Sequence, residues 1–170
     1  GRQQDLEMHT VHLAYSEKNS VFAAAMGVFF SVEGYNQQVT ADQVTLIDKF
    51  FDSLEWGTTD KNPKVAEIPY GQLMHSLNMR ERWTYKGSVT TPPCKTAVYW
   101  NVLRTVYPIK QKHLDQFKAQ LARNTEQKPK TLAETGNWRV IQKTTAAHNA
   151  QIVEAPAVTK TSGSTASSGS

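Results

Sequence analysis

The chain has 170 residues, of which 39% are hydrophobic, and carries a formal net charge of +4 with a pI near 9.2. This length is typical of one globular domain, and no apolar run approaches the roughly 20 residues of a membrane-spanning helix. The basic residues are scattered rather than gathered into a stripe with interleaved aromatic residues. The composition therefore argues against nucleic-acid binding and against a transmembrane segment in this chain.

The first third of the chain predicts two strands followed by a helix. Residues 6–15 alternate between polar and apolar side chains, and residues 21–32 form a nearly continuous apolar run, as in a buried strand. Thr40-Ala-Asp-Gln43 has the pattern of a capping box, in which Thr40 is the N-cap and Gln43 is the third helical residue. Apolar residues at helical spacing follow this box, and Gly57 is expected to end the helix.

The rest of the chain predicts further strands with one more long helix. We expect a helical turn around residues 72–77, strands over residues 81–87 and 96–107, and a helix over residues 110–122. Residues 137–142 have the pattern of a last strand. Long strands with surface helices inserted between them indicate a mainly β or α+β fold around one large sheet.

The two ends of the chain carry different signals. Nearly all residues from Val158 onward are Thr, Ser, Gly or Lys, so we assign residues 151–170 to a disordered tail and residues 1–150 to the folded domain. The N-terminal residues contain no initiating Met and no signal peptide, and they stand directly before a predicted strand. We therefore expect the reading frame to begin inside a longer protein.

Residues 83–94, with the sequence WTYKGSVTTPPC, form the most informative segment. Each proline fixes its own φ and lacks an N–H donor, and the residue before a proline is held in an extended conformation. Thr91 is therefore held extended by Pro92, and Thr90 lies beside this rigid element. The pattern indicates that hydroxyl groups are presented at a fixed position.

A second informative pattern lies in the first predicted strand. Side chains alternate between the faces of a strand, so Glu7 and His9 share one face and His12 lies on the other. A metal-bound imidazole commonly donates its second ring N–H to a carboxylate, and Glu7 has the right spacing to accept from His9. A Glu–His surface pair without a metal is the alternative. We interpret His12 as a core histidine and expect three others to be solvated: His75, His113 and His148.

Cys94 is the only cysteine of the chain, so an intrachain disulfide is impossible. It is either a buried thiol or one half of a disulfide whose partner lies outside this chain, as in a secreted protein.

The segments EMHTVH (7–12), AMGVFF (25–30), WTYKGSVTTPPC (83–94), VYW (98–100) and NWR (137–139), read together, resemble the C-terminal portion of an alpha-class carbonic anhydrase. The resemblance covers about residues 6–142, and the string WTYKGSVTTPPC is its most specific part. It implies a large, mostly antiparallel central sheet with surface helices, incomplete at the N-terminus. It also implies a zinc-dependent lyase that reversibly hydrates carbon dioxide to bicarbonate with a zinc-bound hydroxide, acting as part of a longer protein.

The resemblance assigns roles to individual residues. His9 matches the third zinc-binding histidine, and Glu7 matches the glutamate that holds its other ring nitrogen. Thr90 matches the threonine that orients the hydroxide and faces the substrate, and Thr91 matches its neighbour in the pocket. Cys94 matches one half of the disulfide of secreted members, which implies a secreted, extracellular or lumenal location. The residues that match the apolar wall for carbon dioxide are Val11, Ala25, Val89, Val98 and Trp100.

Several parts of the family's site are missing from this chain. In the family, the other two zinc histidines, the proton-shuttling histidine and the acidic partner of the Thr90 hydroxyl all lie upstream of Leu6. The chain alone is therefore expected to be inactive. The alternative to an enzyme is a catalytically silent carbonic-anhydrase-like binding or scaffold module, and the retention of Glu7, His9, Thr90 and Thr91 favours the enzyme. The sequence leaves the oligomeric state open.

Overall fold

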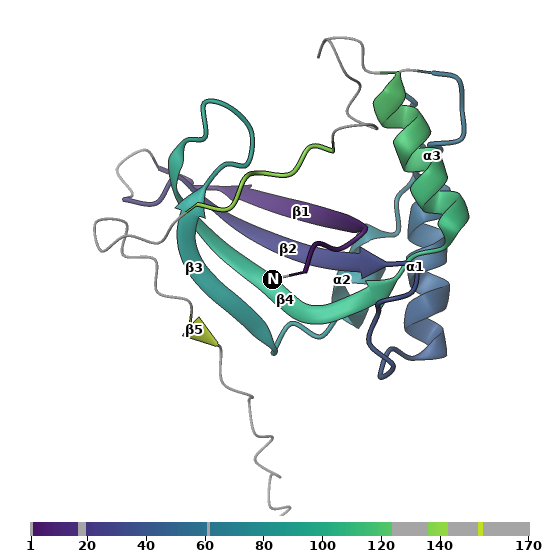
Figure 1. The fold of residues 1–170 in the computed structure, drawn as a ribbon, viewed down its shortest axis with the longest axis horizontal. Coiled ribbons are helices and arrows are strands. Elements are labelled where there is room, and N and C mark those ends of the chain that lie inside the picture. The colour runs from purple at the N-terminus through teal and green to yellow at the C-terminus, as the bar shows by residue number, and fades with distance from the viewer. Residues whose placement is uncertain (1, 17–19, 61, 124–135, 143–152, 155–170) are drawn as a thin grey trace, which may run out of the picture.

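The computed structural model describes residues 2–16, 20–60, 62–123, 136–142 and 153–154. These residues form one sheet with the strand order β1-β2-β4-β3-β5, accompanied by helices (Figure 1). The strands are β1 (Leu6–Leu13), β2 (Ala23–Ser31), β3 (Arg82–Ser88), β4 (Thr96–Pro108) and β5 (Val153–Glu154). The helices are α1 (Ala41–Ser53), α2 (Tyr70–Ser76) and α3 (Gln111–Ala122).

The sheet is mixed, with mostly antiparallel pairing. β1 runs antiparallel to β2, and β3 runs antiparallel to both β4 and β5. The central pair, β2 and β4, is parallel, so the chain must cross over between these strands, and α1, α2 and β3 all lie within that connection. The predicted fold class, a large and mostly antiparallel sheet with surface helices, is confirmed.

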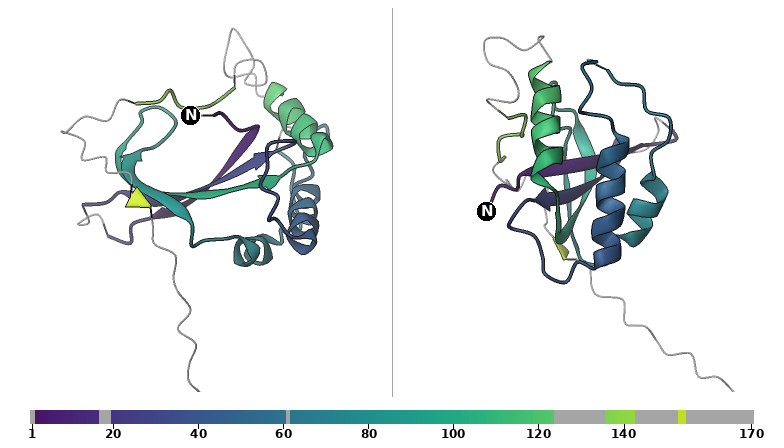
Figure 2. Two further views of the ribbon diagram at one scale, coloured as in Figure 1. Left: turned by 60° about the horizontal axis from the view of Figure 1, so that its bottom comes forward. Right: turned by 90° about the vertical axis from the view of Figure 1, so that its right-hand side faces the viewer.

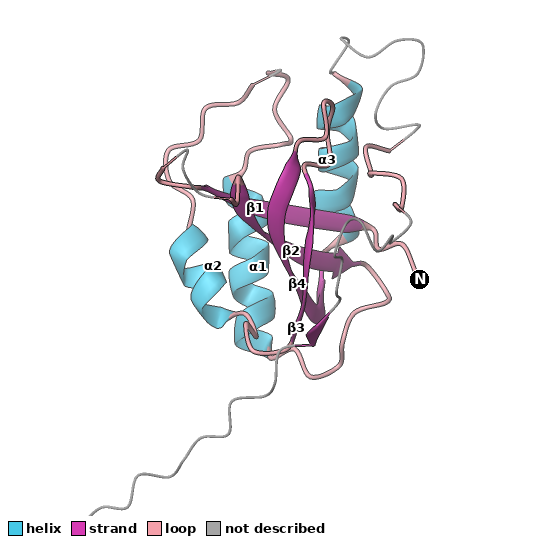
Figure 3. Ribbon diagram, turned by 90° about the vertical axis from the view of Figure 1, so that its left-hand side faces the viewer, coloured by secondary structure: helices cyan, strands magenta, loops and turns pink. Residues whose placement is uncertain are grey.

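One face of the sheet is covered by helices. Figures 2 and 3 show α1 and α2 gathered on one side of the strands, whereas α3 lies near the end of the sheet beside α1. Side chains from the strands and the helices form one buried cluster there, including Val28, Phe30, Leu103 and Tyr107 from the sheet and Phe51 from α1. This cluster, which we call the helix-side core, packs the sheet against α1 and α2.

The elements with clear patterns lie where they were predicted, except that α1 ends at Ser53, with Leu54 as its C-cap, rather than at Gly57. The capping box at the start of α1 is confirmed, because Thr40 Oγ1 accepts from the Gln43 N–H at 3.3 Å and Gln43 Oε1 accepts from the Thr40 N–H at 2.9 Å. The predicted turn around residues 72–77 is a short helix, α2. Every helix of the described residues is too short or too polar to cross a lipid bilayer.

The strand predicted over residues 137–142 is wrong. These residues have no strand pairing, and Trp138, Val140 and Ile141 are exposed by 61%, 71% and 91%. An alternating pattern makes a strand only when a neighbouring strand accepts its backbone hydrogen bonds, and this segment has no such pairing. The domain boundary at residue 150 stays a prediction, since residues 143–152 and 155–170 lie outside the described ones and Val153–Glu154 pairs with β3.

Two of the histidine predictions are also wrong. His12 is exposed rather than part of a core, because it lies near the end of β1, where its neighbours Val11 and Leu13 are exposed as well. His113 is fully buried rather than solvated, because the first turn of α3 packs it against α1. The exposure of His75 is confirmed, and His148 lies outside the described residues.

Candidate functional site

The candidate site lies on the face of the sheet opposite the helix-side core. The register of the strands places His9 beside Gly27 and Val11 beside Ala25, and it places Ala25 beside Trp100 on β4. Alternation then puts the side chains of these residues, and that of Glu7, on one face. We call this face the site face.

The predicted pair of Glu7 and His9 is present on the site face. His9 Nε2 lies 2.9 Å from Glu7 Oε1, and both side chains are partly exposed. An ionised carboxylate only accepts hydrogen bonds, so the Nε2–H of His9 donates a hydrogen bond to Glu7. The other ring nitrogen, Nδ1, then keeps its lone pair and can bind a cation. This is the arrangement that orients a metal-binding histidine.

Gly27 makes room for the Glu7 carboxylate, and sequence reasoning missed this role. A Cβ atom at Gly27 would lie 2.9 Å from Glu7 Oε1 and 3.4 Å from Val102 Cγ2. A contact of 2.9 Å to a carbon atom is too close, so a side chain here would displace the carboxylate from His9. A glycine inside an otherwise apolar strand is the signal that could have revealed this close approach.

Trp100 lies at the centre of the site face. Its ring meets the His9 ring edge-on, with the two centroids 4.7 Å apart. Val89 and Tyr85 pack against a buried cluster to which Trp100 belongs. The cluster consists of Ala23, Ala25, Val98, Trp100 and Val102. The structure therefore brings together the predicted apolar wall next to His9, with Val11 beside Ala25 at its exposed margin.

Trp100 also connects His9 to the loop that follows β3. The indole Nε1 donates to the carbonyl oxygen of Ser88 at 3.1 Å. The Tyr85 ring stacks on Trp100 with the centroids 6.2 Å apart, and a Cβ atom at Gly87 would lie 3.1 Å from the Trp100 ring, so the glycine admits both rings. Sequence reasoning missed Ser88 and Gly87, because their roles depend on the pairing of β3 with β4.

The loop itself holds the two predicted threonines. The Val89 N–H donates to Lys95 O at 2.8 Å and closes the loop at its base, and the Cys94 N–H donates to Thr91 O at 2.8 Å. Thr90 is half-buried and Thr91 is exposed. The backbone hydrogen bonds and the prolines thus fix the threonines just beyond the end of β3. Cys94 is a half-buried free thiol.

Burial and the charge of Glu7 both affect a titratable group of the site face. Burial, and after it the negative charge of Glu7, raises the pKa of the Tyr85 hydroxyl, so Tyr85 stays neutral at physiological pH. Within the residues that the structure describes, no group of three or more His, Cys, Asp or Glu side chains is placed to hold a metal ion. His9 therefore fits the role of one metal ligand, oriented by Glu7, and further ligands have to come from elsewhere.

Comparison with known proteins places the chain in a family. The model of the family "Eukaryotic-type carbonic anhydrase" matches residues 1–151. Carbonic anhydrase 3 of Homo sapiens is 26% identical over 145 residues, which are 78% of this chain and 50% of the relative. Carbonic anhydrase 7 of Mus musculus is 30% identical over 123 residues, which are 71% of this chain and 46% of the relative. The chain belongs to the eukaryotic-type carbonic anhydrase family, as the resemblance implied.

A solved structure supports the fold. The alpha-carbonic anhydrase from Thermovibrio ammonificans, in complex with the inhibitor sulfanilamide, matches with a TM-score of 0.53 and 24% identity. The match covers 86% of this chain and 52% of that protein. The chain thus spans about half the length of the relatives that it matches.

Proposed function

We propose that this chain is the C-terminal part of a zinc-dependent carbonic anhydrase, which reversibly hydrates carbon dioxide to bicarbonate in the complete protein. The observation that carries the proposal is the hydrogen bond from His9 Nε2 to Glu7 Oε1, which leaves Nδ1 free as a ligand. A silent binding module has no chemical need for this pair or for the small residue, Gly27, that admits it.

His9 would hold the zinc ion through Nδ1, together with ligands from the part of the complete protein outside this chain. Zn²⁺ supplies Lewis-acid chemistry that lowers the pKa of a bound water to about 7. Glu7 keeps the imidazole in the tautomer that binds the metal and raises its basicity. Packing of the His9 ring against Trp100 fixes the direction in which Nδ1 points.

Thr90 would orient the attacking hydroxide by accepting a hydrogen bond from it, so that a lone pair faces the substrate. The Thr90 hydroxyl must then donate its own hydrogen bond to an acceptor, which would come from the upstream part of the protein. Carbon dioxide is apolar and offers little to hydrogen-bond, so the buried wall around Trp100 suits it as a receptor. Ala25 and Val89 are smaller than the valine and leucine common at the matching positions of the family, which would leave a roomier pocket.

Cys94 supports, as a further proposal, a secreted or lumenal protein with the disulfide partner upstream.

The 170-residue chain and the complete protein are expected to differ sharply in activity. Stopped-flow measurement should find that the complete protein hydrates carbon dioxide and that a zinc chelator abolishes this activity. The chain alone should show only the uncatalysed rate, because its described residues contain no group of three or more possible metal ligands. A complete protein that binds no zinc and lacks activity would identify the silent module instead. Chelator-sensitive activity of the chain alone would overturn the proposal that the other zinc ligands lie outside this chain.

Gly27→Ala is expected to weaken zinc binding in the complete protein by roughly 10- to 100-fold, the range for loss of a carboxylate that orients a metal ligand. The reason is the contact of 2.9 Å between the added Cβ and Glu7 Oε1. Competition with a fluorescent chelator measures the affinity. Gly71→Ala is the matched control, because a Cβ there meets nothing within 4 Å. Equal affinities for the two variants would show that Glu7 does not need this space.

A further inference from the structure

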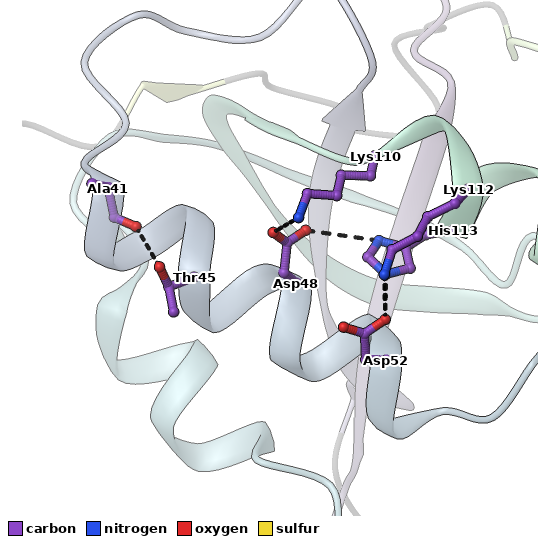
Figure 4. Close-up of polar contacts among 7 residues, drawn as sticks. All are labelled: Ala41, Thr45, Asp48, Asp52, Lys110, Lys112 and His113. Carbon is purple, nitrogen blue, oxygen red and sulfur yellow. Dashed lines mark hydrogen bonds and ion pairs between the residues drawn. The ribbon is translucent and has the colours of Figure 1, made fainter.

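A buried histidine lies outside the site face, where α3 packs against α1. His113 is the third residue of α3, and its side chain is fully buried. Its ring packs against the Phe51 ring of α1 with the centroids 5.5 Å apart. Figure 4 shows that two aspartates of α1 approach this ring from different sides. A charge on a ring buried in this way is costly unless neighbouring groups pair with it.

Both ring nitrogens of His113 face carboxylates. Nε2 lies 2.9 Å from Asp52 Oδ1, and Nδ1 lies 3.9 Å from Asp48 Oδ1. The two aspartates are one helical turn apart on α1 and therefore lie on the same helix face. Nδ1 is buried and makes no hydrogen bond within the described structure. One nitrogen is thus satisfied, and the other is directed at a carboxylate that it does not yet bond.

Charged groups from both helices surround the ring. They are Asp48 and Asp52 from α1, and Lys110 and Lys112 from the start of α3. Lys110 Nζ lies 2.5 Å from Asp48 Oδ2, and Lys112 Nζ lies 2.8 Å from Asp52 Oδ1. The first turn of α3 contains no acidic residue of its own, so the aspartates of α1 supply the negative charge that a helix N-terminus favours.

The neutral and the protonated ring differ in how well they suit this site. Asp52 only accepts, so a neutral His113 carries its proton on Nε2 and leaves a buried lone pair on Nδ1 facing Asp48. A proton on Nδ1 replaces that arrangement with a second donor directed at a carboxylate. The lysines and the positive end of α3 oppose the added charge, but each lysine is already paired with an aspartate.

We propose that His113 is an acid-responsive latch, in which uptake of one proton at Nδ1 adds a contact with Asp48 and tightens the joint between α3 and α1. The proton comes from a hydronium ion of the solvent, which loses one O–H bond as the N–H bond forms. None of these residues belongs to the site face, so the latch operates whether or not zinc is bound.

The latch has a defined pH window. Gain of the proton gives the joint a second N–H donor directed at a carboxylate, so the joint strengthens as the solution becomes acidic. The hydrogen bonds from Lys112 and His113 lower the pKa of the Asp52 carboxyl. A lowered carboxyl pKa gives stability that is present above the unfolded-state pKa and is lost as the pH falls through the folded-state value. The joint is therefore strongest in mildly acidic solution and weakens in strong acid.

Thermal unfolding of the complete protein at pH values of about 8 and about 6, on either side of the histidine range, tests the latch. We expect the Tm difference between wild type and His113→Gln to be larger at the lower pH by about 2–4 °C. Glutamine can still donate to Asp52 but cannot take up a proton. His75→Gln, which replaces an exposed histidine of α2, is the control and should keep the full pH response of the wild type. Equal Tm differences at the two pH values would overturn the latch.

Nitrogen-15 NMR of the imidazole rings provides a second test, which begins with the wild-type protein. The His113 signals, assigned through contacts with the Phe51 ring, should show a proton on Nε2 alone at the higher pH. They should show protons on both nitrogens at the lower pH, and Asp48→Asn should move that change to still lower pH. A wild-type ring that keeps one proton throughout this range would overturn the proposal. The same conclusion follows if wild type and Asp48→Asn gain the second proton at the same pH.

Discussion

Loss of zinc, and of all activity with it, is the expected result of His9→Ala in the complete protein. In the proposed enzyme His9 is one of three protein ligands, and removal of one of them leaves too few to retain the ion. Metal analysis after dialysis should find zinc in the parent and almost none in the variant. Stopped-flow hydration of carbon dioxide should fall to the uncatalysed rate.

His12→Ala is the matched control for this experiment. It changes a histidine of the same strand that lies on the opposite face and is exposed. Zinc content and rate should both stay at the parental level. Retention of zinc by His9→Ala would place the metal elsewhere and would separate the Glu7–His9 pair from the chemistry.

Thr90→Ala is expected to lower kcat by roughly 10²-fold, the scale for removal of a positioned polar group that acts in the transition state. The loop hydrogen bonds of Val89 and Cys94 involve backbone atoms, so the loop should keep its shape without the threonine hydroxyl. Zinc content should be unchanged, which separates a defect in orientation from a loss of metal.

Thr90→Ser serves as the control, since serine keeps the hydroxyl and loses only a methyl group. We expect it to recover most of the activity that alanine removes. If serine and alanine are equally slow, the methyl group rather than the hydroxyl matters at this position, and Thr90 has no part in directing the nucleophile.

Local patterns predicted most of the fold, because each depends on neighbours in sequence. The capping box at Thr40 specifies the start of α1 without any information from the rest of the chain. The alternation in β1 likewise sufficed to place Glu7 and His9 on one face. The strand expected at residues 137–142 failed because a strand also needs a partner, and the pattern says nothing about a partner.

The features that sequence reasoning missed all depend on contacts between distant segments. His113 is buried beside two aspartates of α1, and the residues around His113 in the sequence give no sign of these partners. The role of Gly27 depends on its position beside His9 in the sheet. The hydrogen bond from Trp100 to Ser88 depends on the register of β3 with β4, which is shifted near Ser88.

The parallel pairing of β2 with β4 has a consequence for the order of folding. Ala25 and Trp100 are neighbours in the sheet but lie far apart along the chain, with the whole crossover between them. Contacts of such high sequence separation close slowly, because the entropy of the intervening chain must be lost before they form. β1 and β2 are close in sequence and can pair early, so we expect the Glu7–His9 pair to form before its contact with Trp100. In the proposed enzyme, the histidine of this chain is therefore oriented for zinc before the apolar wall for the substrate exists.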